Sequence, residues 1–581
     1  MNERYRFAIN WDSKPIRSYI MSTKLMTVQG EALAGKPWNI YPRPQLKRDN
    51  YVNLNGNWDF TVSMESALPA DFDRTIRVPF CPESTLSGIE EHFPEGSYLF
   101  YRCGFSRPEG QRVLLHIGAA DQELTCYVNN IEIGSHEGGY EAITFDITHA
   151  LQEENTVVLR CKDDLRDQSY PYGKQVMQRG GMWYTPVSGI WQSVWLEGVC
   201  ENYVNSLDIQ ATLTQATVTI TPTLSGKIIC EGVSYPLVDG KAIIMPNAPR
   251  LWTPEEPNLY PFTVEAGEDR FESYFALRTL ETKTVGGYPR LCLNGKSYFF
   301  HGLLDQGYWP DGLFTPAAPQ CYAEDILRAK ELGFNMLRKH IKVEAEEFYY
   351  QCDRLGMVVF QDMVNNGDYN FLRDTVAPTF LSQHKNDKNM HPDAKTRQRF
   401  MNGMEATVRQ LKNHPCICYW TIFNEAWGQF DSTPVYLHLK ALDNSRFIDT
   451  TSGWYRGSKS DVESLHIYFD MWHRLKKSAK PIVLSEFGGF TYAACDHIFN
   501  TENTYGYGTC KTPEALTEKL RKIYEQRVIP AAKKGLCASV YTQISDVEDE
   551  INGLLTYDRK VVKPDLETML SIAHQLQTAV R

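Results

Sequence analysis

From about Arg290 to the C-terminus, short apolar segments alternate with stretches of helical periodicity. This alternation is typical of parallel β/α architecture, because each parallel strand needs a crossover, usually a helix, before the next one. Eight strands in roughly 290 residues is the size of a (β/α)8 barrel. The eight predicted strands are 298–303, 334–338, 357–362, 417–424, 447–452, 464–468, 482–486 and 536–541.

Helical patterns fit between several of these segments. Ala345, Phe348, Cys352 and Leu355 form one apolar stripe at helical spacing, and Gly356 follows it as a common helix stop. The stripe predicts a helix between the second and third strands, as the barrel requires.

The residues before the barrel show short strand patterns separated by turn residues. Between 37 and 200, two strand patterns flank Asn129-Asn130, and the region predicts an all-β sandwich of jelly-roll type. The alternating run 217–224 and the later run 275–280 predict a second, immunoglobulin-like sandwich. The predicted parts are an N-terminal extension 1–36, a jelly-roll domain 37–200, an immunoglobulin-like domain 201–284 and a barrel 285–581.

Length and charge limit the class of protein. A chain of 581 residues is too long for one hydrophobic core, which agrees with several domains. A formal charge of −11 argues against nucleic acid and anionic membranes as partners. We also expect no membrane span, because no apolar stretch approaches the required length.

Cysteine usage points to a reducing compartment. The 14 cysteines are scattered, and none forms a Cys-x-x-Cys pair. The first residues lack the apolar core of a secretory signal, so we expect a cytoplasmic protein. No glycine-rich phosphate loop and no histidine pair with ligand spacing is readable, so we expect neither a required cofactor nor a catalytic metal.

Two of the predicted strands end at a glutamate. Glu425 follows the apolar run 416–424, and Glu486 follows 482–485. A single glutamate at a barrel rim is more often an ion-pair partner, but two that share the C-terminal face can meet across the mouth. Two carboxylates in that arrangement are the groups that break a glycosidic bond. Asn424, directly before Glu425, can bind a sugar 2-hydroxyl.

With these motifs in place, the chain resembles glycoside hydrolase family 2, which includes β-galactosidases, β-glucuronidases and β-mannosidases. Residues 412–425 are similar to the acid/base signature of that family, and 485–488 to its nucleophile strand. Segments 116–121, 134–147 and 251–260 resemble its jelly-roll and immunoglobulin-like domains. The resemblance covers about residues 37 to 581.

The resemblance implies roles for individual residues. Glu425 would be the acid/base and Glu486 the nucleophile, and their environments must favour opposite protonation states. Arg338 would orient the nucleophile, Tyr468 would contact it, and Tyr541 stands where relatives carry a tryptophan under the sugar. The candidate substrate-binding residues are Asp305, Arg338, His340, Asp362, Asn424, Trp427, Trp454, His466, Tyr468 and Tyr541.

Two departures from the family pattern bear on the sugar. After Arg338 the chain reads 339–342 as Lys-His-Ile-Lys where the family commonly has Ser-Ser-His-Tyr-Pro, and the third strand ends Asp362-Met instead of Asp-Glu. This basic cluster either selects an unusual or acidic sugar or pairs with Asp362 and Glu344. The Asn-Lys-Lys-Gly segment that β-glucuronidases use for the uronate carboxylate is missing from the sequence.

The predicted function is that of an exo-acting retaining β-glycosidase, with β-galactosidase as the leading specificity. β-Glucuronidase, β-mannosidase and arabinosidase-type specificities are alternatives within the family. A barrel endo-glucanase shares the two glutamates, and a non-catalytic carbohydrate-binding protein is the alternative from another class.

The expected partner is an oligosaccharide or glycoside substrate, and we expect a homo-oligomer. Loops from neighbouring subunits often complete such pockets, and the long insertion 365–400 is suited to that role. Some relatives hold a structural Mg²⁺ or Na⁺, but its ligands are not readable in this sequence.

Overall fold

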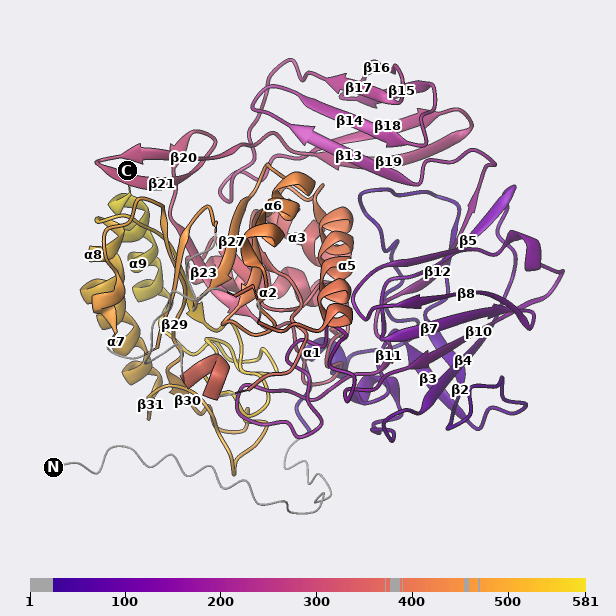
Figure 1. The fold of residues 1–581 in the computed structure, drawn as a ribbon, viewed down its shortest axis with the longest axis horizontal. Coiled ribbons are helices and arrows are strands. Elements are labelled where there is room, and N and C mark those ends of the chain that lie inside the picture. The colour runs from indigo at the N-terminus through magenta and orange to yellow at the C-terminus, as the bar shows by residue number, and fades with distance from the viewer. Residues whose placement is uncertain are drawn as a thin grey trace.

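The computed structural model describes residues 24–370, 372–376, 387–388, 390–453, 459–468 and 471–580. Its three largest apolar cores belong to an N-terminal sandwich, a second sandwich and a barrel. Figure 1 shows the strands of the N-terminal sandwich in purple on one side, the second sandwich above, and the orange-to-yellow helices around the barrel. None of the described helices is long and apolar enough to cross a membrane.

Two antiparallel sheets form the N-terminal sandwich. In β2 (Gly56–Ser63), Trp58 and Phe60 are buried in the core while Asn57 and Asp59 are exposed, because side chains alternate across a strand. The six-stranded sheet has the order β3 (Arg74–Val78), β2, β4 (Tyr98–Phe105), β10 (Asn155–Lys162), β7 (Glu123–Val128) and β8 (Ile131–Glu137). The four-stranded sheet has the order β1 (Tyr51–Asn53), β12 (Val194–Val199), β5 (Arg112–Ile117) and β9 (Ile143–Asp146).

The predicted hairpin at Asn129-Asn130 is confirmed. β7 and β8 pair antiparallel around it, and the two asparagines have φ of 51° and 65°. A two-residue hairpin turn of this kind needs positive φ at both positions, which asparagine tolerates better than most residues.

The second sandwich has smaller sheets around Val218, Ile228 and Phe262. The run predicted from Thr217 lies in β14, but the run 275–280 connects two strands instead of forming one. Its sheets are β13 (Ser206–Ala211), β14 (Ala216–Thr221) and β17 (Lys241–Ile244), and β16 (Val233–Leu237), β15 (Gly226–Cys230), β18 (Tyr260–Ala266) and β19 (Asp269–Phe275). The jelly-roll and immunoglobulin-like class names and the domain boundaries stay predictions.

All eight predicted barrel strands are present, with ends that differ from the prediction by at most two residues. They form one parallel sheet in which neighbours follow chain order. The strands are β23 (Phe300–Asp305), β24 (Met336–Lys339), β25 (Val358–Asp362), β26 (Ile417–Asn424), β27 (Phe447–Ser452), β28 (Glu463–Ile467), β29 (Ile482–Gly488) and β32 (Leu536–Thr542).

The first and last strands of this sheet, β27 and β28, nearly close the barrel. The Asp461 N–H donates to the Ile448 carbonyl at 2.9 Å, and Ser452 Oγ lies 3.0 Å from His466 Nε2. The C-terminal ends of all eight strands therefore surround one mouth.

Helices pack around the barrel as the sequence predicts. In α3 (Glu346–Leu355), Phe348 and Cys352 are buried, and Gly356 ends the helix at φ 75°. The other long helices are α2 (Gln320–Glu331), α5 (Ala394–Leu411), α6 (Ser432–Leu442), α7 (Pro513–Ile523) and α9 (Leu566–Ala579).

A long loop of the N-terminal sandwich, residues 163–188, reaches the barrel mouth. The N–H groups of Tyr172 and Gly173 both donate to the Asn365 carbonyl at 3.2 Å. Gly173 has φ 63°, and a Cβ there would lie 3.0 Å from the Ile341 carbonyl oxygen, so the close approach requires glycine. The loop therefore forms one wall of the mouth.

Part of the predicted N-terminal extension also packs on the barrel. Thr27 caps the short helix α1 (Val28–Glu31), and its N–H and Oγ donate to the buried Asp311 at 2.9 and 2.5 Å. Residues 1–23 of the extension lie outside the described residues.

Candidate active site

The two predicted glutamates meet at the barrel mouth. Glu425 directly follows β26, and Glu486 lies near the end of β29. One carboxylate oxygen of each and a ring nitrogen of His466 all lie within 4.8 Å of one another. The carboxyl groups of retaining glycosidases are about 5–5.5 Å apart, whereas inverting enzymes separate them by about 6.5–9.5 Å. Oxygen atoms within 4.8 Å of each other are nearer to the shorter of these two separations.

Arg338, at the end of β24, connects three side chains of the mouth. Its Nη1 donates to Glu486 Oε1 at 2.9 Å, its Nε to Asp362 Oδ1 at 3.0 Å, and its Nη2 to Asn424 Oδ1 at 2.9 Å. The guanidinium is only 1% exposed, so charge-assisted bonds fix its orientation. The contact with Glu486 is the one that the sequence predicted.

The surroundings of Glu486 favour its ionised form. Burial alone would raise the pKa of this carboxyl, but its electrostatic interactions with His466, Arg338 and His340 outweigh that effect. The Tyr468 hydroxyl also donates to Oε2. Together these groups lower the pKa of Glu486 to about 2, so the carboxylate carries its charge at neutral pH.

Glu425 has a more open environment. Its side chain is 18% exposed, compared with 5% for Glu486. His466 Nδ1 lies 2.7 Å from Glu425 Oε1 and 3.5 Å from Glu486 Oε2, so one imidazole links the two carboxylates. Glu425 and Ala426 have φ of 51° and 62°, a turn that aims the carboxylate into the mouth.

Asn424 keeps one polar group available. Its Oδ1 accepts from Arg338, and its Nδ2 has no hydrogen-bond partner among the residues that the structure describes. Because Arg338 fixes the amide orientation, Nδ2 is the atom that can donate to a sugar hydroxyl.

The basic cluster after Arg338 is paired with acids. His340 Nδ1 lies 2.8 Å from Asp362 Oδ2, and Lys339 Nζ lies 2.7 Å from Asp305 and 2.9 Å from Glu344. All five side chains are buried. Of the two interpretations of the basic cluster, the structure shows the one in which its side chains pair with acids. Asp305 is one of these acids, because it pairs with Lys339.

Of three further predicted aromatic residues of the site, the structure places Tyr541 and Trp427 and does not describe Trp454. Tyr541 is fully buried, and its hydroxyl accepts the Phe490 N–H at 3.0 Å. The ring of Tyr541 is enclosed by protein in this structure, and its substrate-binding role stays a prediction. Trp427 is 3% exposed and donates to the Gly367 carbonyl at 3.2 Å. Trp454 lies outside the described residues.

Several residues of the mouth were not predicted. Trp183, in the 163–188 loop, contacts Trp427 with ring centroids 5.3 Å apart and Tyr369 at 5.0 Å. Tyr507 stacks on Tyr468 at 4.3 Å. One feature of the sequence could have indicated Trp183: residues 163–188 show no strand pattern, and long loops without secondary structure are often functional.

The predicted insertion 365–400 contributes to the mouth of its own chain. Its first residues, Asn365 and Tyr369, contact the 163–188 loop. Residues 371, 377–386 and 389 of the insertion lie outside the described residues.

Glu425, His466 and Glu486 also have the spacing of a metal-ligand group. In Glu486, however, Arg338 donates to Oε1 and Tyr468 donates to Oε2. Both oxygens therefore already accept hydrogen bonds from the protein, which suits an ionised nucleophile better than a metal ligand.

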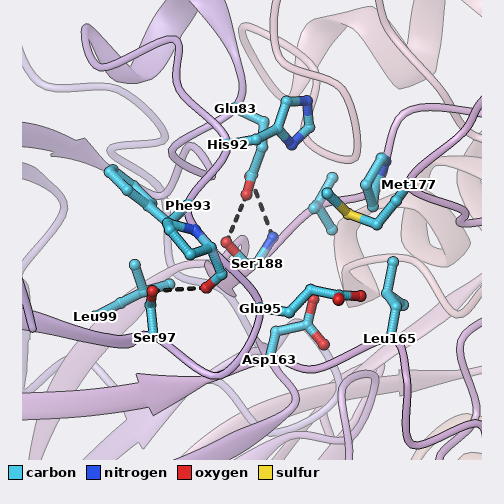
Figure 2. A pocket seen from close by; sticks show the side chains of 13 residues that line it. Glu83, His92, Phe93, Glu95, Ser97, Leu99, Asp163, Leu165, Met177 and Ser188 are labelled. Atoms are coloured by element: carbon cyan, nitrogen blue, oxygen red, sulfur yellow. Dashed lines mark hydrogen bonds between the residues drawn. The ribbon is translucent and has the colours of Figure 1, made fainter. Parts of the chain in front are cut away.

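A separate cavity lies in the N-terminal sandwich (Figure 2). Its volume is about 30 Å³, and Glu83, His92 and Ser188 are among its lining residues. The Glu83 carboxylate accepts from the Ser188 N–H at 3.1 Å and from its Oγ at 2.5 Å. A water needs about 10–15 Å³ of such volume, so this cavity is too small for a sugar ring.

Removing the Tyr468 hydroxyl should shift the acid limb of the pH–rate profile. Without this donor the ionised form of Glu486 is less stable, so Tyr468→Phe should raise its pKa from about 2 toward the ordinary value of 4.5. An ionised Glu486 is needed for attack, so the acid limb of kcat/KM should move to higher pH, with circular dichroism monitoring folding.

Tyr235→Phe is the matched control, because the Tyr235 hydroxyl donates to the Met245 carbonyl in the second sandwich. If the acid limb of Tyr468→Phe coincides with those of the wild type and of this control, the Tyr468 hydroxyl does not stabilise the ionised form of Glu486.

Comparison with known proteins agrees with this geometry. Residues 289–526 match the family described as glycosyl hydrolases family 2, TIM barrel domain. A β-galactosidase of Thermoanaerobacter pseudethanolicus is 25% identical over 76% of this chain, which spans 61% of that protein's length. A β-glucuronidase of Bacteroides fragilis is 25% identical over 75% of the chain and 68% of its own length.

A solved structure shows the same fold. The β-glucuronidase of an uncultured Clostridium species superposes with a TM-score of 0.71 at 18% identity, over 92% of this chain and 99% of that one. The matched barrel domain, the relatives and the paired glutamates agree with one another. Residues 289–526 match the family 2 glycosyl hydrolase barrel domain, and over about three quarters of its length the chain is similar to enzymes named β-galactosidase and β-glucuronidase.

Proposed function

We propose that the protein is an exo-acting retaining β-glycosidase. The observation that carries this proposal is the approach of Glu425 and Glu486 to within 4.8 Å, together with their different environments. Two carboxyl groups this close suit a double displacement, in which one of them forms a bond to the sugar.

In the first step, Glu486 attacks the anomeric carbon while Glu425 gives its proton to the glycosidic oxygen. The bond between the anomeric carbon and that oxygen breaks, and the sugar becomes an ester of Glu486. Arg338 and Tyr468 hold the nucleophile for attack. The Asn424 Nδ2 donates to the 2-hydroxyl, a contact that strengthens as the transition state forms.

In the second step, Glu425 takes a proton from water, and the water oxygen attacks the anomeric carbon. The ester bond breaks, Glu486 leaves as a carboxylate, and the sugar departs with its original configuration. His466 bonds to Glu425 in both steps and keeps its carboxyl in place.

The 163–188 loop supports exo-action, because a wall across the mouth leaves less room for a continuing chain than an open cleft does. The names of relatives support two specificities, β-galactoside and β-glucuronide. β-Galactoside is the specificity that we infer from the sequence, and β-glucuronide has at least equal support from the relatives.

A panel of p-nitrophenyl α- and β-glycosides tests the proposal. It should contain neutral hexosides, arabinosides and uronides, and product anomers should be followed by NMR. We expect turnover of a β-glycoside with first release of the β-anomer. Release of the α-anomer contradicts a retaining mechanism, and sugar binding without any turnover supports the non-catalytic alternative.

A further inference from the structure

Lys174 places a positive charge at the barrel mouth from the 163–188 loop. It follows Gly173, which packs on the Ile341 carbonyl, and its own carbonyl accepts the Tyr184 N–H at 3.0 Å. Its ammonium lies 5.4 Å from the ring centre of Trp183. Trp183 in turn contacts Trp427, two residues after Glu425. Lys174 is thus part of the same wall as the aromatic residues of the mouth.

The charge of Lys174 reaches the groups around the nucleophile. The pKa of His340 is lowered mainly by burial, and the charge of Lys174 adds to that effect. Burial raises the pKa of Glu550, and Lys174 is among the groups that oppose the rise. Glu550 is itself within electrostatic reach of Glu486. The Trp183 ring connects the Lys174 ammonium to Trp427, so Lys174 lies at the same mouth as the two glutamates.

Lys174 has no acidic partner in the part of the chain that the structure describes. Its ammonium makes no hydrogen bond there and has no carboxylate oxygen within 4.0 Å. The other cations of the mouth are paired, for example Arg338 with Glu486 at 2.9 Å and Arg179 with Asp549 at 3.0 Å. Lys174 is half-buried, so it has lost part of its hydration and has only the Trp183 ring in exchange.

The nearby Glu550 does not supply the missing anion. The Tyr184 hydroxyl donates to its Oε2, and Asn552 Nδ2 donates to its Oε1 at 2.9 Å. These bonds hold the Glu550 carboxylate in place beyond ion-pair distance from Lys174. A bound ligand is therefore the remaining source of a negative charge next to Lys174.

We propose that Lys174 determines specificity by binding a carboxylate on the glycone, so that the preferred substrate is a β-linked uronide. This inference rests on the proposed function and names the substrate class of its site. A hexuronide differs from the matching hexoside only by a carboxylate in place of the hydroxymethyl group. The charged group is therefore the one feature by which Lys174 can separate the two sugars.

The test compares matched substrates. Wild type, Lys174→Met and Lys174→Arg are assayed with p-nitrophenyl β-glucuronide and β-galacturonide against the corresponding β-glucoside and β-galactoside. We expect wild type to prefer a uronide over its neutral counterpart. Lys174→Met should lower the uronide-to-neutral ratio of kcat/KM by about tenfold to a hundredfold, and Lys174→Arg should keep most of it.

Lys227→Met is the matched control, because Lys227 is exposed and pairs with Glu265 at 3.1 Å in the second sandwich. Its ratio should equal that of wild type. Calorimetry with free glucuronate and galacturonate adds a readout without turnover, in which Lys174→Met should weaken uronate binding by a similar factor.

The outcomes separate the two proposals. Absence of turnover on every β-glycoside overturns the proposed function, while uronate binding that depends on Lys174 still supports this inference. Turnover of neutral glycosides in preference to uronides overturns the inference alone. So does an unchanged ratio in a Lys174→Met protein whose circular dichroism spectrum and Tm match wild type.

Discussion

Replacing Glu486 with alanine should lower kcat/KM for aryl β-glycosides by about 10⁴-fold or more. The variant lacks the atom that forms the bond to the sugar, and neither Glu425 nor Asp362 is placed to replace it. Glu425 is committed to the leaving-group side, and Asp362 is held by Arg338 and His340. Steady-state kinetics with p-nitrophenyl substrates measures the loss.

Azide should restore part of this activity, because it fits the space that the carboxylate leaves. It attacks from the side of the missing nucleophile, so the product is an α-glycosyl azide with inverted configuration. Glu331→Ala, on the outer helix α2, is the matched control and should retain wild-type kinetics. Near-wild-type activity in Glu486→Gln, or a rescue product of β-configuration, is incompatible with Glu486 as the nucleophile.

The barrel could be predicted because its strands are buried on both faces and therefore read as continuous apolar runs. β26 is the clearest case, with all eight residues buried and both ends as predicted. Its C-terminal end also carries Glu425, so the position of one catalytic candidate followed directly from the fold. The run 275–280 gives only its two ends to strands, since β19 ends at Phe275 and β20 begins at Leu280.

The orientation of side chains within the barrel could not be predicted. β29 shifts register against β32 between Leu484 and Phe487, and β28 shifts against β29 beside His466. Such shifts decide which residues face the mouth, and they leave no mark in the sequence pattern. Tyr541 ends the predicted strand as expected, yet its ring packs inside, where a Cβ on Gly488 would lie 2.3 Å from it.

The wall of the pocket escaped prediction because it comes from another domain. Lys174 and Trp183 lie in a loop without periodicity, and they reach the barrel only through tertiary contacts such as Gly173 with Asn365. Catalytic residues at strand ends are local features of sequence, whereas specificity residues of this kind depend on how two domains pack.

Replacing Glu425 with alanine should have an effect that depends on the leaving group. Glycosides with poor leaving groups, such as phenyl or alkyl glycosides, need the proton and should lose about 10²–10⁴-fold in kcat/KM. Dinitrophenyl glycosides leave without protonation, so their first step should be much less affected. Their second step still lacks the base, so stopped-flow traces should show a burst of phenolate followed by slow turnover.

Azide should also accelerate this variant, but with the opposite stereochemistry. It attacks the sugar ester of Glu486 from the face that Glu425 no longer occupies, and the product is a β-glycosyl azide. The two variants thus differ in the configuration of one product, which separates the two roles independently of any rate. An α-azide from Glu425→Ala, or equal losses for phenyl and dinitrophenyl substrates, would mean that Glu425 is not the acid/base. The contact of 2.7 Å between His466 Nδ1 and the Glu425 carboxylate would then have no part in proton transfer by Glu425.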